Sequence, residues 1–144
     1  MTPLVVDASV VVKWFIPEEQ SEAARALLGL TGYSFFAPEH LFAELGNVVW
    51  KKVRRGDLDS RVAAALIADL ARVPVETVST RALLADGYSV AAATGLTVYD
   101  GLYAALAVRL DTRLITADRR IVNVLKRRPG AGTVAEWIGD CRFP

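Results

Sequence analysis

The sequence predicts an α/β fold in which helices cover both faces of a mostly parallel β-sheet. Short apolar segments alternate with longer helical segments along the 144 residues, and this order is typical of parallel sheets. The segment Leu4-Val5-Val6 is apolar at every position, as expected of a central strand buried on both faces. The chain is 53% hydrophobic, which favours a packed core over disorder. At this length we expect one domain, residues 1–144.

Gly, Pro and capping residues divide the first half of the chain into its expected elements. These are helix 9–15, helix 18–28, strand 34–37, helix 39–55 and helix 60–72. The first four end before or at Pro17, Gly29, Pro38 and Gly56. Asp57 or Asp59 is the expected N-cap of the last helix, because an aspartate side chain accepts hydrogen bonds from free backbone N–H groups.

The second half repeats the alternation of strands and helices. The expected elements are strand 75–78, helix 80–95, helix 100–110, strand 114–116, helix 118–127 and an edge strand at 133–134. The expected N-caps of the three helices are Ser79 or Thr80, Asp100 and Asp118. Right-handed crossovers then place the C-terminal ends of all strands at one edge of the sheet.

Three aspartates are expected at this edge. Asp7 follows strand 4–6, Asp118 follows strand 114–116, and Asp100 begins the helix that leads into the latter strand. Open parallel sheets bind ligands beyond the carboxyl ends of their strands, so these side chains should face one crevice. Taken singly, each aspartate is explained as a helix cap. Their joint placement favours a functional site.

Glu44 is the fourth unusual carboxylate. It lies three residues after Leu41 and four before Val48, so it shares the apolar stripe of its helix with Leu41, Leu45 and Val48. A carboxylate on such a stripe normally has a partner. Pairing with an arginine, or a place at the margin of the stripe, would explain Glu44 without a function.

Four neighbouring carboxylates require protonation or a cation. Two unit charges about 4 Å apart repel by roughly 4 kcal/mol at an effective dielectric constant near 20. Carboxylate and water ligands suit Mg²⁺ or Mn²⁺. His40 is the only histidine and Cys141 the only cysteine, so the sequence disfavours zinc and excludes an internal disulfide.

The charge distribution is more informative than the net charge of +1. Basic residues gather in 51–55 and again in 119–128. They suit either solvated helix ends or contacts with phosphates, and the sequence leaves both open. The chain has no apolar run of about 20 residues and no basic segment before an apolar N-terminus, so we expect a cytoplasmic protein without a membrane span or signal peptide.

Four segments together resemble the PIN-domain nucleases, and in size and order the VapC-type toxin ribonucleases of toxin–antitoxin pairs. They are Val6-Asp7-Ala8-Ser9, Glu44-Leu45-Gly46-Asn47, the run Tyr99-Asp100-Gly101-Leu102-Tyr103-Ala104-Ala105-Leu106-Ala107, and Leu114-Ile115-Thr116-Ala117-Asp118. The resemblance spans residues 4 to about 134. It implies a PIN-like three-layer α/β/α sandwich around a twisted, mostly parallel sheet. Gly101 departs from the family pattern, which often has alanine there.

The resemblance also implies a ribonuclease site. Asp7, Glu44, Asp100 and Asp118 would coordinate Mg²⁺ or Mn²⁺ and carry the catalysis, while Ser9, Thr116 and Asn47 match polar positions beside the acids. Arg119 and Arg120 would hold the RNA backbone next to Asp118. The implied partners are an RNA substrate, a cognate antitoxin and a second copy of the chain. Helices 17–28 and 39–55 would form the antitoxin groove, with Trp14, Phe15, Phe42 and Trp50 as candidate walls.

Two other functions fit parts of the pattern. A phosphoacceptor or phosphatase of flavodoxin-like topology also gathers aspartates at strand ends, but Ser9 and Asp118 stand where such proteins usually have a second aspartate and a lysine. A PIN-like module that binds RNA or protein without catalysis is the other alternative. The complete acidic set argues against it, because idle carboxylates destabilise a fold.

Overall fold

A computed structural model describes residues 1–128 and 134–143. In the described part of the chain, five parallel strands form one sheet in the order β3-β2-β1-β4-β5. The strands are β1 (Thr2–Val6), β2 (Tyr33–Pro38), β3 (Val75–Val78), β4 (Leu114–Thr116) and β5 (Ala135–Trp137). Leu4, Val5 and Val6 are almost fully buried in the central strand β1, as the apolar run predicts.

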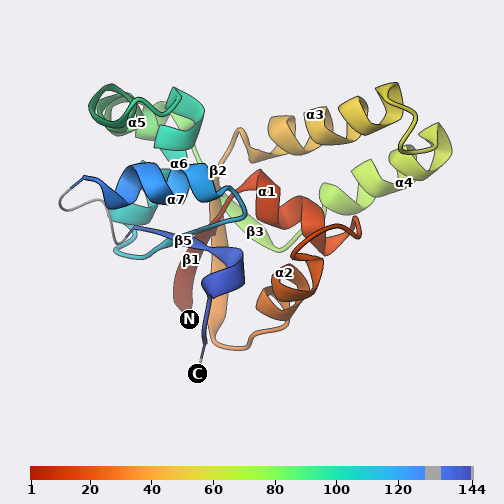
Figure 1. The fold of residues 1–144 in the computed structure, drawn as a ribbon, viewed down its shortest axis with the longest axis horizontal. Coiled ribbons are helices and arrows are strands. Elements are labelled where there is room, and N and C mark those ends of the chain that lie inside the picture. The colour runs from red at the N-terminus through yellow and green to blue at the C-terminus, as the bar shows by residue number, and fades with distance from the viewer. Residues whose placement is uncertain (129–133, 144) are drawn as a thin grey trace.

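Helices flank the sheet on two sides, so the fold is the expected three-layer α/β/α sandwich (Figure 1). The helices are α1 (Ala8–Val11), α2 (Ser21–Leu28), α3 (Leu41–Arg54), α4 (Ser60–Leu70), α5 (Thr80–Thr94), α6 (Val98–Arg109) and α7 (Arg119–Lys126), with 3-10 helices η1 (Val12–Trp14) and η2 (Ile138–Asp140). In Figure 1, α1 to α4 lie on one side of the strands and α5 to α7 on the other.

The strand order reverses direction next to β1. From β1 the chain steps outward to β2 and β3, and then returns across the sheet to β4 and β5. In open parallel sheets, the crevice at such a reversal is the usual place for a ligand. The order differs from the 2-1-3-4-5 order of flavodoxin-like proteins, so a flavodoxin-like topology is wrong for this chain.

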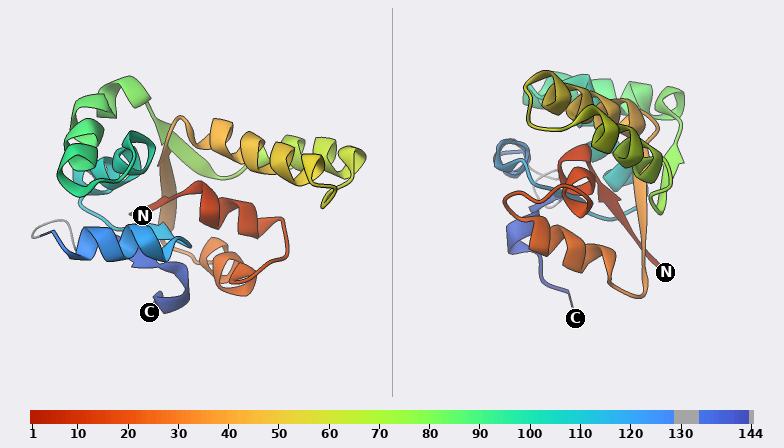
Figure 2. Two further views of the ribbon diagram at one scale, coloured as in Figure 1. Left: turned by 45° about the horizontal axis from the view of Figure 1, so that its top comes forward. Right: turned by 90° about the vertical axis from the view of Figure 1, so that its right-hand side faces the viewer.

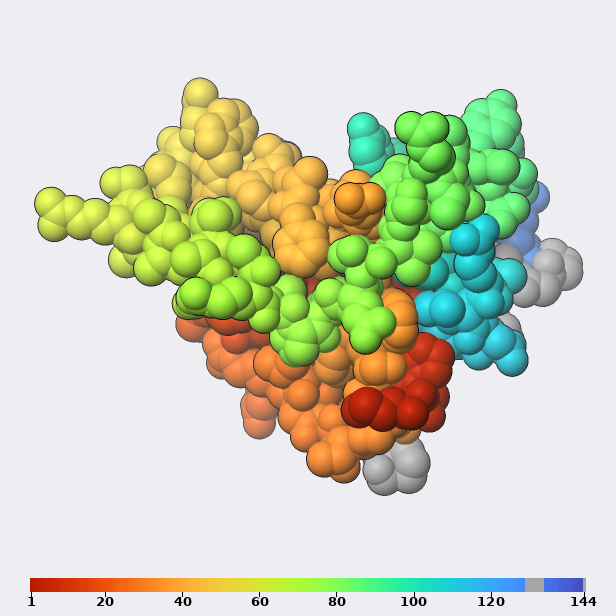
Figure 3. Space-filling view, turned by 180° about the vertical axis from the view of Figure 1, so that it is seen from behind, coloured from red at the N-terminus to blue at the C-terminus, as the bar shows by residue number. Residues whose placement is uncertain are grey.

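Helices α3 and α4 pack on each other and project from the body of the molecule as an arm (Figure 2). From behind, a notch separates the base of this arm from α5 (Figure 3). Lys51, Lys52 and Arg54 lie in the last turn of α3, where cations interact favourably with the helix dipole. The basic run at 51–55 is therefore at a helix end, as one of its two interpretations expected.

Gly101 is required by the close packing of α5 against α6. A Cβ atom at Gly101 would lie 2.4 Å from the carbonyl oxygen of Gly87, which belongs to the backbone and cannot move aside as a side chain can. A Cβ at Gly87 would in turn meet the side chain of Leu102 at 2.6 Å. The departure of Gly101 from the family pattern is thus matched by a second glycine, and α6 is fixed where it carries Asp100.

Three expected helix starts differ from the structure by more than one residue, and one of them is that of α3, which begins at Leu41 rather than residue 39. Asp100 does not cap α6: the helix begins at Val98, and the Thr97 hydroxyl accepts a hydrogen bond from the backbone N–H of Asp100 at 3.2 Å. A threonine three residues upstream satisfies that N–H, which leaves the Asp100 carboxylate free for other contacts. Helix α2 begins at Ser21, three residues later than expected.

The end of the chain also differs in detail. The last strand covers Ala135–Trp137 rather than 133–134, and Thr133 lies outside the described residues. Within the described ranges, no single helix is long and apolar enough to cross a membrane. Helices α5 and α6 meet the length and composition only as a pair, and they are bent by 114° at the break between them.

Candidate active site

Asp7 is a buried carboxylate at the end of the central strand β1. Asp7 is 6% exposed, and its side chain caps α1. Oδ1 accepts hydrogen bonds from the Ser9 hydroxyl at 2.5 Å and the Val10 backbone N–H at 3.3 Å, and Oδ2 accepts one from the Thr116 hydroxyl at 2.5 Å. Burial raises the pKa of Asp7 to about 6, although these hydrogen bonds oppose the shift. The carboxylate is therefore held in one orientation.

Ser9 and Thr116 connect the ends of β1 and β4. The Ser9 oxygen also accepts a hydrogen bond from the backbone N–H of Ala117 at 2.9 Å, and the Thr116 oxygen accepts one from the N–H of Asp118 at 3.0 Å. The two hydroxyl oxygens lie 3.4 Å apart. Both residues thus lie beside the acids, as the resemblance implies, and Thr116 links the orientation of Asp7 to the position of Asp118.

Asp100 and Asp118 share one cation. The Arg120 guanidinium lies 3.1 Å from Oδ2 of Asp100 and 3.4 Å from Oδ2 of Asp118. Oδ1 of Asp118 caps α7 by accepting the Arg120 backbone N–H at 2.9 Å. The hydrogen bond with Asp100 raises the pKa of Arg120. Two carboxylates from α6 and the start of α7 are therefore aimed at one position, which a positive charge fills.

Glu44 does not lie in the core, which corrects the expectation from its helical stripe. Leu41, Leu45 and Val49 form the buried face of α3, and the side chain of Glu44 is 35% exposed. Its Oε1 accepts a hydrogen bond from the Tyr103 hydroxyl at 2.7 Å. Burial and the negative charge of Glu44 both raise the pKa of Tyr103, so this phenol stays protonated and donates.

Tyr103 and His40 are the neighbours of Glu44 that the sequence patterns did not single out. Nε2 of His40 lies 3.1 Å from Oε1 of Glu44, but both buried ring nitrogens lack hydrogen-bond geometry with any described partner. His40 directly precedes α3, and its ring packs edge-on against Tyr103. The position of Tyr103 three residues after Asp100 on one helix was the available signal, because residues at that spacing share a face.

All four carboxylates line one cavity of about 320 Å³. Asn47 lines it too, and so does Lys51, two turns after Glu44 on the same face of α3. In the ranges that the structure describes, no three acidic, histidine or cysteine side chains converge closely enough to form a ready metal site. The donor set is nonetheless all oxygen, and the shared Arg120 shows that a cation fits between two of its members. An all-oxygen donor set of this kind suits a hard cation such as Mg²⁺ or Mn²⁺.

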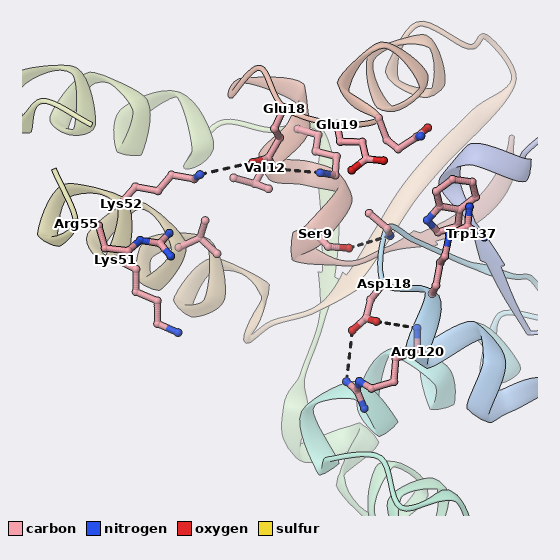
Figure 4. Close-up of a pocket in the computed structure, with 15 residues that line it drawn as sticks. Ser9, Val12, Glu18, Glu19, Lys51, Lys52, Arg55, Asp118, Arg120 and Trp137 are labelled. Atoms are coloured by element: carbon pink, nitrogen blue, oxygen red, sulfur yellow. Dashed lines mark hydrogen bonds and ion pairs between the residues drawn. The ribbon is translucent and has the colours of Figure 1, made fainter. Parts of the chain in front are cut away.

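Arg119 and Arg120 differ in their surroundings although they are adjacent. Arg120 faces the carboxylates, whereas the guanidinium of Arg119 lies 3.5 Å from the ring centroid of Trp137 in a cation–π contact. Both line a second cavity of about 680 Å³, which shares Ser9, Val48, Lys51 and Asp118 with the acidic one. The two cavities are therefore adjacent and share one wall. Figure 4 shows Ser9 and Asp118 in the larger cavity, between the α3 lysines and Trp137.

A parallel sheet with carboxylates at its reversal point defines a class of proteins, the α/β proteins with an acidic site at the strand ends. Within that class, the model of the PIN-domain family matches residues 4–138. The chain belongs to the PIN-domain family. It is 32% identical over 120 residues to ribonuclease VapC3 of Pyrobaculum aerophilum, a match that covers 82% of this chain and 91% of the relative.

Solved structures share the fold at lower sequence identity. A crystal structure of PAE2754 from Pyrobaculum aerophilum superposes with a TM-score of 0.67 at 23% identity and covers 93% of this chain and 83% of that one. FitAcB from Neisseria gonorrhoeae gives a TM-score of 0.60 at 19% identity, with 96% and 99% covered. VapBC2 from Rickettsia felis, bound to a DNA fragment from its promoter, gives 0.59 at 15%, with 94% and 98% covered.

Proposed function

We propose that this protein is a metal-dependent endoribonuclease, and that it acts as the toxin of a toxin–antitoxin pair. The observation that carries the proposal is the set of four carboxylates that four separate elements bring to one cavity at the reversal of the sheet. The ribonuclease relative, which this chain covers almost completely, supports RNA as the substrate. The alternative of a PIN-like module without catalysis is disfavoured, because the acidic set is complete.

Asp7, Asp100 and Asp118 would hold Mg²⁺ or Mn²⁺, with Glu44 as a further ligand or as the general base for the attacking water. When bound, such an ion lowers the pKa of a water and offsets the charge that develops on the phosphodiester during in-line attack. Ser9 and Thr116 keep Asp7 in one orientation through the two hydroxyl hydrogen bonds. Tyr103 does the same for Glu44. Asn47 lies in the cavity wall, where its amide can orient substrate or water.

Arg119 and Arg120 would hold the RNA backbone beside the scissile phosphate. Both side chains line the larger cavity, and Asp118 lines it beside them. Contacts of this kind position a strand without reading its sequence. They also make binding depend on salt, because each neutralised phosphate releases counterions.

The proposed protein partners are a cognate antitoxin and a second copy of the chain. The structural neighbours include VapBC2 and a toxin–antitoxin complex from Klebsiella pneumoniae, which supports an antitoxin for this chain. Phe42 and Trp50 on α3 are 37% and 54% exposed, so they suit an apolar contact with an antitoxin helix. Trp14 does not, because it is 6% exposed and its Nε1 donates to the Ala24 carbonyl at 2.9 Å. We further propose a cytoplasmic location, where the protein would meet both its RNA substrate and its antitoxin.

A cleavage assay tests the proposal. The parent protein should cleave mixed single-stranded RNA when Mg²⁺ or Mn²⁺ is added, and excess EDTA should stop it. Asp118→Asn should cut at least about 100-fold more slowly, since it removes charge from a carboxylate of the site. Asp59 caps α4 far from the cavity. The variant Asp59→Asn is therefore the control for a change at a helix cap. Metal-independent cleavage, or equal rates in both variants, would contradict the proposal.

A further inference from the structure

The cavity next to the carboxylates is a groove of opposite charge. Six basic residues and three acidic ones line its volume of about 680 Å³, and it shares four residues with the acidic cavity. The basic residues are Lys13, Lys51, Lys52, Arg55, Arg119 and Arg120. A polyanion bound in the acidic cavity could extend along this groove, because the two cavities share part of their walls.

Ion pairs inside the groove leave a net positive wall. Glu18 lies 3.1 Å from Lys13 and 3.5 Å from Lys52, so two lysines compensate one carboxylate. Among the described residues, Lys51 has no ion-pair partner, and it lines both cavities. Lys51 is thus placed to bind a phosphate directly next to the carboxylate site.

Trp137 forms the far side of the groove. It ends β5 in register with Thr116, so the sheet fixes its backbone relative to the site (Figure 4). The indole lies directly against Gly139, where a Cβ atom would meet the ring at 1.9 Å. The guanidinium of Arg119 lies 3.5 Å from the ring centroid. Aromatic rings and guanidinium planes are the surfaces on which unpaired bases stack.

We propose that the Arg119–Trp137 pair is a stacking platform for one unpaired base of the substrate, with Lys51 binding a phosphate between that base and the acidic cavity. The inference rests on the proposed function and names the residues that would hold a single strand of the RNA substrate. A duplex would not offer a base to the platform, because its bases are paired and stacked on each other. A protein segment fits the groove less well, because lysine and arginine dominate its lining and, among the described residues, Trp137 is its only large apolar side chain.

The chain carries a matched control for the platform. Trp50 and Arg54 on α3 form a second tryptophan–arginine pair, with the guanidinium 5.1 Å from the ring centroid. Trp50 is 54% exposed and does not line the groove. Comparing the two pairs separates stacking in the groove from general binding by exposed tryptophan.

The experiment measures RNA binding in EDTA, where metal chemistry plays no part. Fluorescence anisotropy of a labelled single-stranded RNA should show about 5- to 100-fold weaker binding for Trp137→Leu and about twofold or less for Trp50→Leu. Trp137→Phe should recover part of the loss, and RNA should quench indole fluorescence in Trp50→Phe but much less in Trp137→Phe. Lys51→Gln should lower the slope of log affinity against log salt by about 0.7.

Folding is checked by thermal melting, and Arg119→Gln, at an exposed position, tests the platform if Trp137→Leu unfolds. Equal affinities for the Trp137 and Trp50 variants, or equal binding of duplex and single strand, would overturn the inference. Unchanged RNA affinity in all groove variants would overturn it too, and would leave the groove to a protein partner. Since binding is measured without metal, a failure here leaves metal-dependent cleavage intact, whereas loss of cleavage alone would contradict only the proposed function.

Discussion

Two parts of the acidic cavity hold their carboxylates in opposite ways. Asp7 is buried, and the hydroxyl groups of Ser9 in α1 and Thr116 at the end of β4 each fix one of its oxygens. Asp100 and Asp118 lie closer to solvent, and an arginine that is 58% exposed in its side chain bridges them. Neutral donors within the core cannot be exchanged without disturbing the fold, but an exposed guanidinium can move. The comparison shows one carboxylate that is held rigidly and two carboxylates that are bridged by a replaceable cation.

The largest expected effect on RNA cleavage comes from changing Asp7, the rigidly held carboxylate. Asp7→Asn keeps the shape of the side chain but removes its charge, so RNA cleavage should fall by at least about 100-fold. Metal titration should show the loss of affinity, and circular dichroism should show an intact fold. Cleavage within a few-fold of the parent would show that Asp7 only caps α1 and would break the comparison.

The pH dependence of stability is the next largest effect. The pKa of Asp7 is raised to about 6 in the folded protein, from an ordinary value of 3.8. Between these values the folded state binds more protons than the unfolded state, so the contribution of Asp7 to stability falls as pH rises from about 4 to 6. The total is about 3 kcal/mol.

Urea unfolding of the metal-free protein at pH 4.5 and 7.5 measures this contribution. The stability of Asp7→Asn relative to the parent should be higher at pH 7.5 than at pH 4.5, because the variant has no charge to bury. A constant difference between the two proteins at both pH values would mean that Asp7 is not held in a desolvated environment.

Thr116→Val sharpens the comparison by removing one fixed donor with little change of shape. The Thr116 hydroxyl donates to Asp7 and accepts the N–H of Asp118. Its loss should weaken Mn²⁺ binding by about 10- to 100-fold. It should also lower the free energy of unfolding by about 1–3 kcal/mol, because a backbone donor loses its partner. Thr112→Val, whose hydroxyl donates to the Pro3 carbonyl far from the acids, is the control for losing a threonine hydrogen bond.

The sequence predicted the fold well where one local pattern dominates. Strands 75–78 and 114–116 have the expected bounds, and the strand 4–6 is central as its apolar run requires. Local competition caused the errors: Thr97 rather than Asp100 caps α6, because it lies one position before the helix. Glu44 was expected on the buried stripe of its helix, because helical spacing predicts which residues share a face but not which elements pack against that face.

The site was predicted in its members but not in its contacts. Asp7, Asp100 and Asp118 line one cavity, as strand order and right-handed crossovers lead one to expect. Glu44 lines it too, as the family resemblance implied. The hydrogen bond from Tyr103 to Glu44 joins residues that are far apart in the chain. The bridging of the two aspartates by Arg120 depends on the rotamer of a long side chain. No periodicity encodes such contacts. Their roles in metal binding and catalysis stay predictions.

The smallest expected effect comes from Arg120, the replaceable cation. It tests the central claim that the carboxylates form one cation site. Mn²⁺ is titrated by calorimetry into the metal-free parent, Arg120→Ala, Arg119→Ala and Asp100→Asn. An exposed ion pair contributes about 0.2–1 kcal/mol, so Arg120→Ala should bind Mn²⁺ up to about 5-fold more tightly than the parent. Arg119→Ala removes an equal charge that contacts Trp137 instead, and should change the affinity less. Asp100→Asn should lose most of the binding. Equal heats in all four proteins would show that Arg120 occupies no metal position and that the carboxylates do not act together.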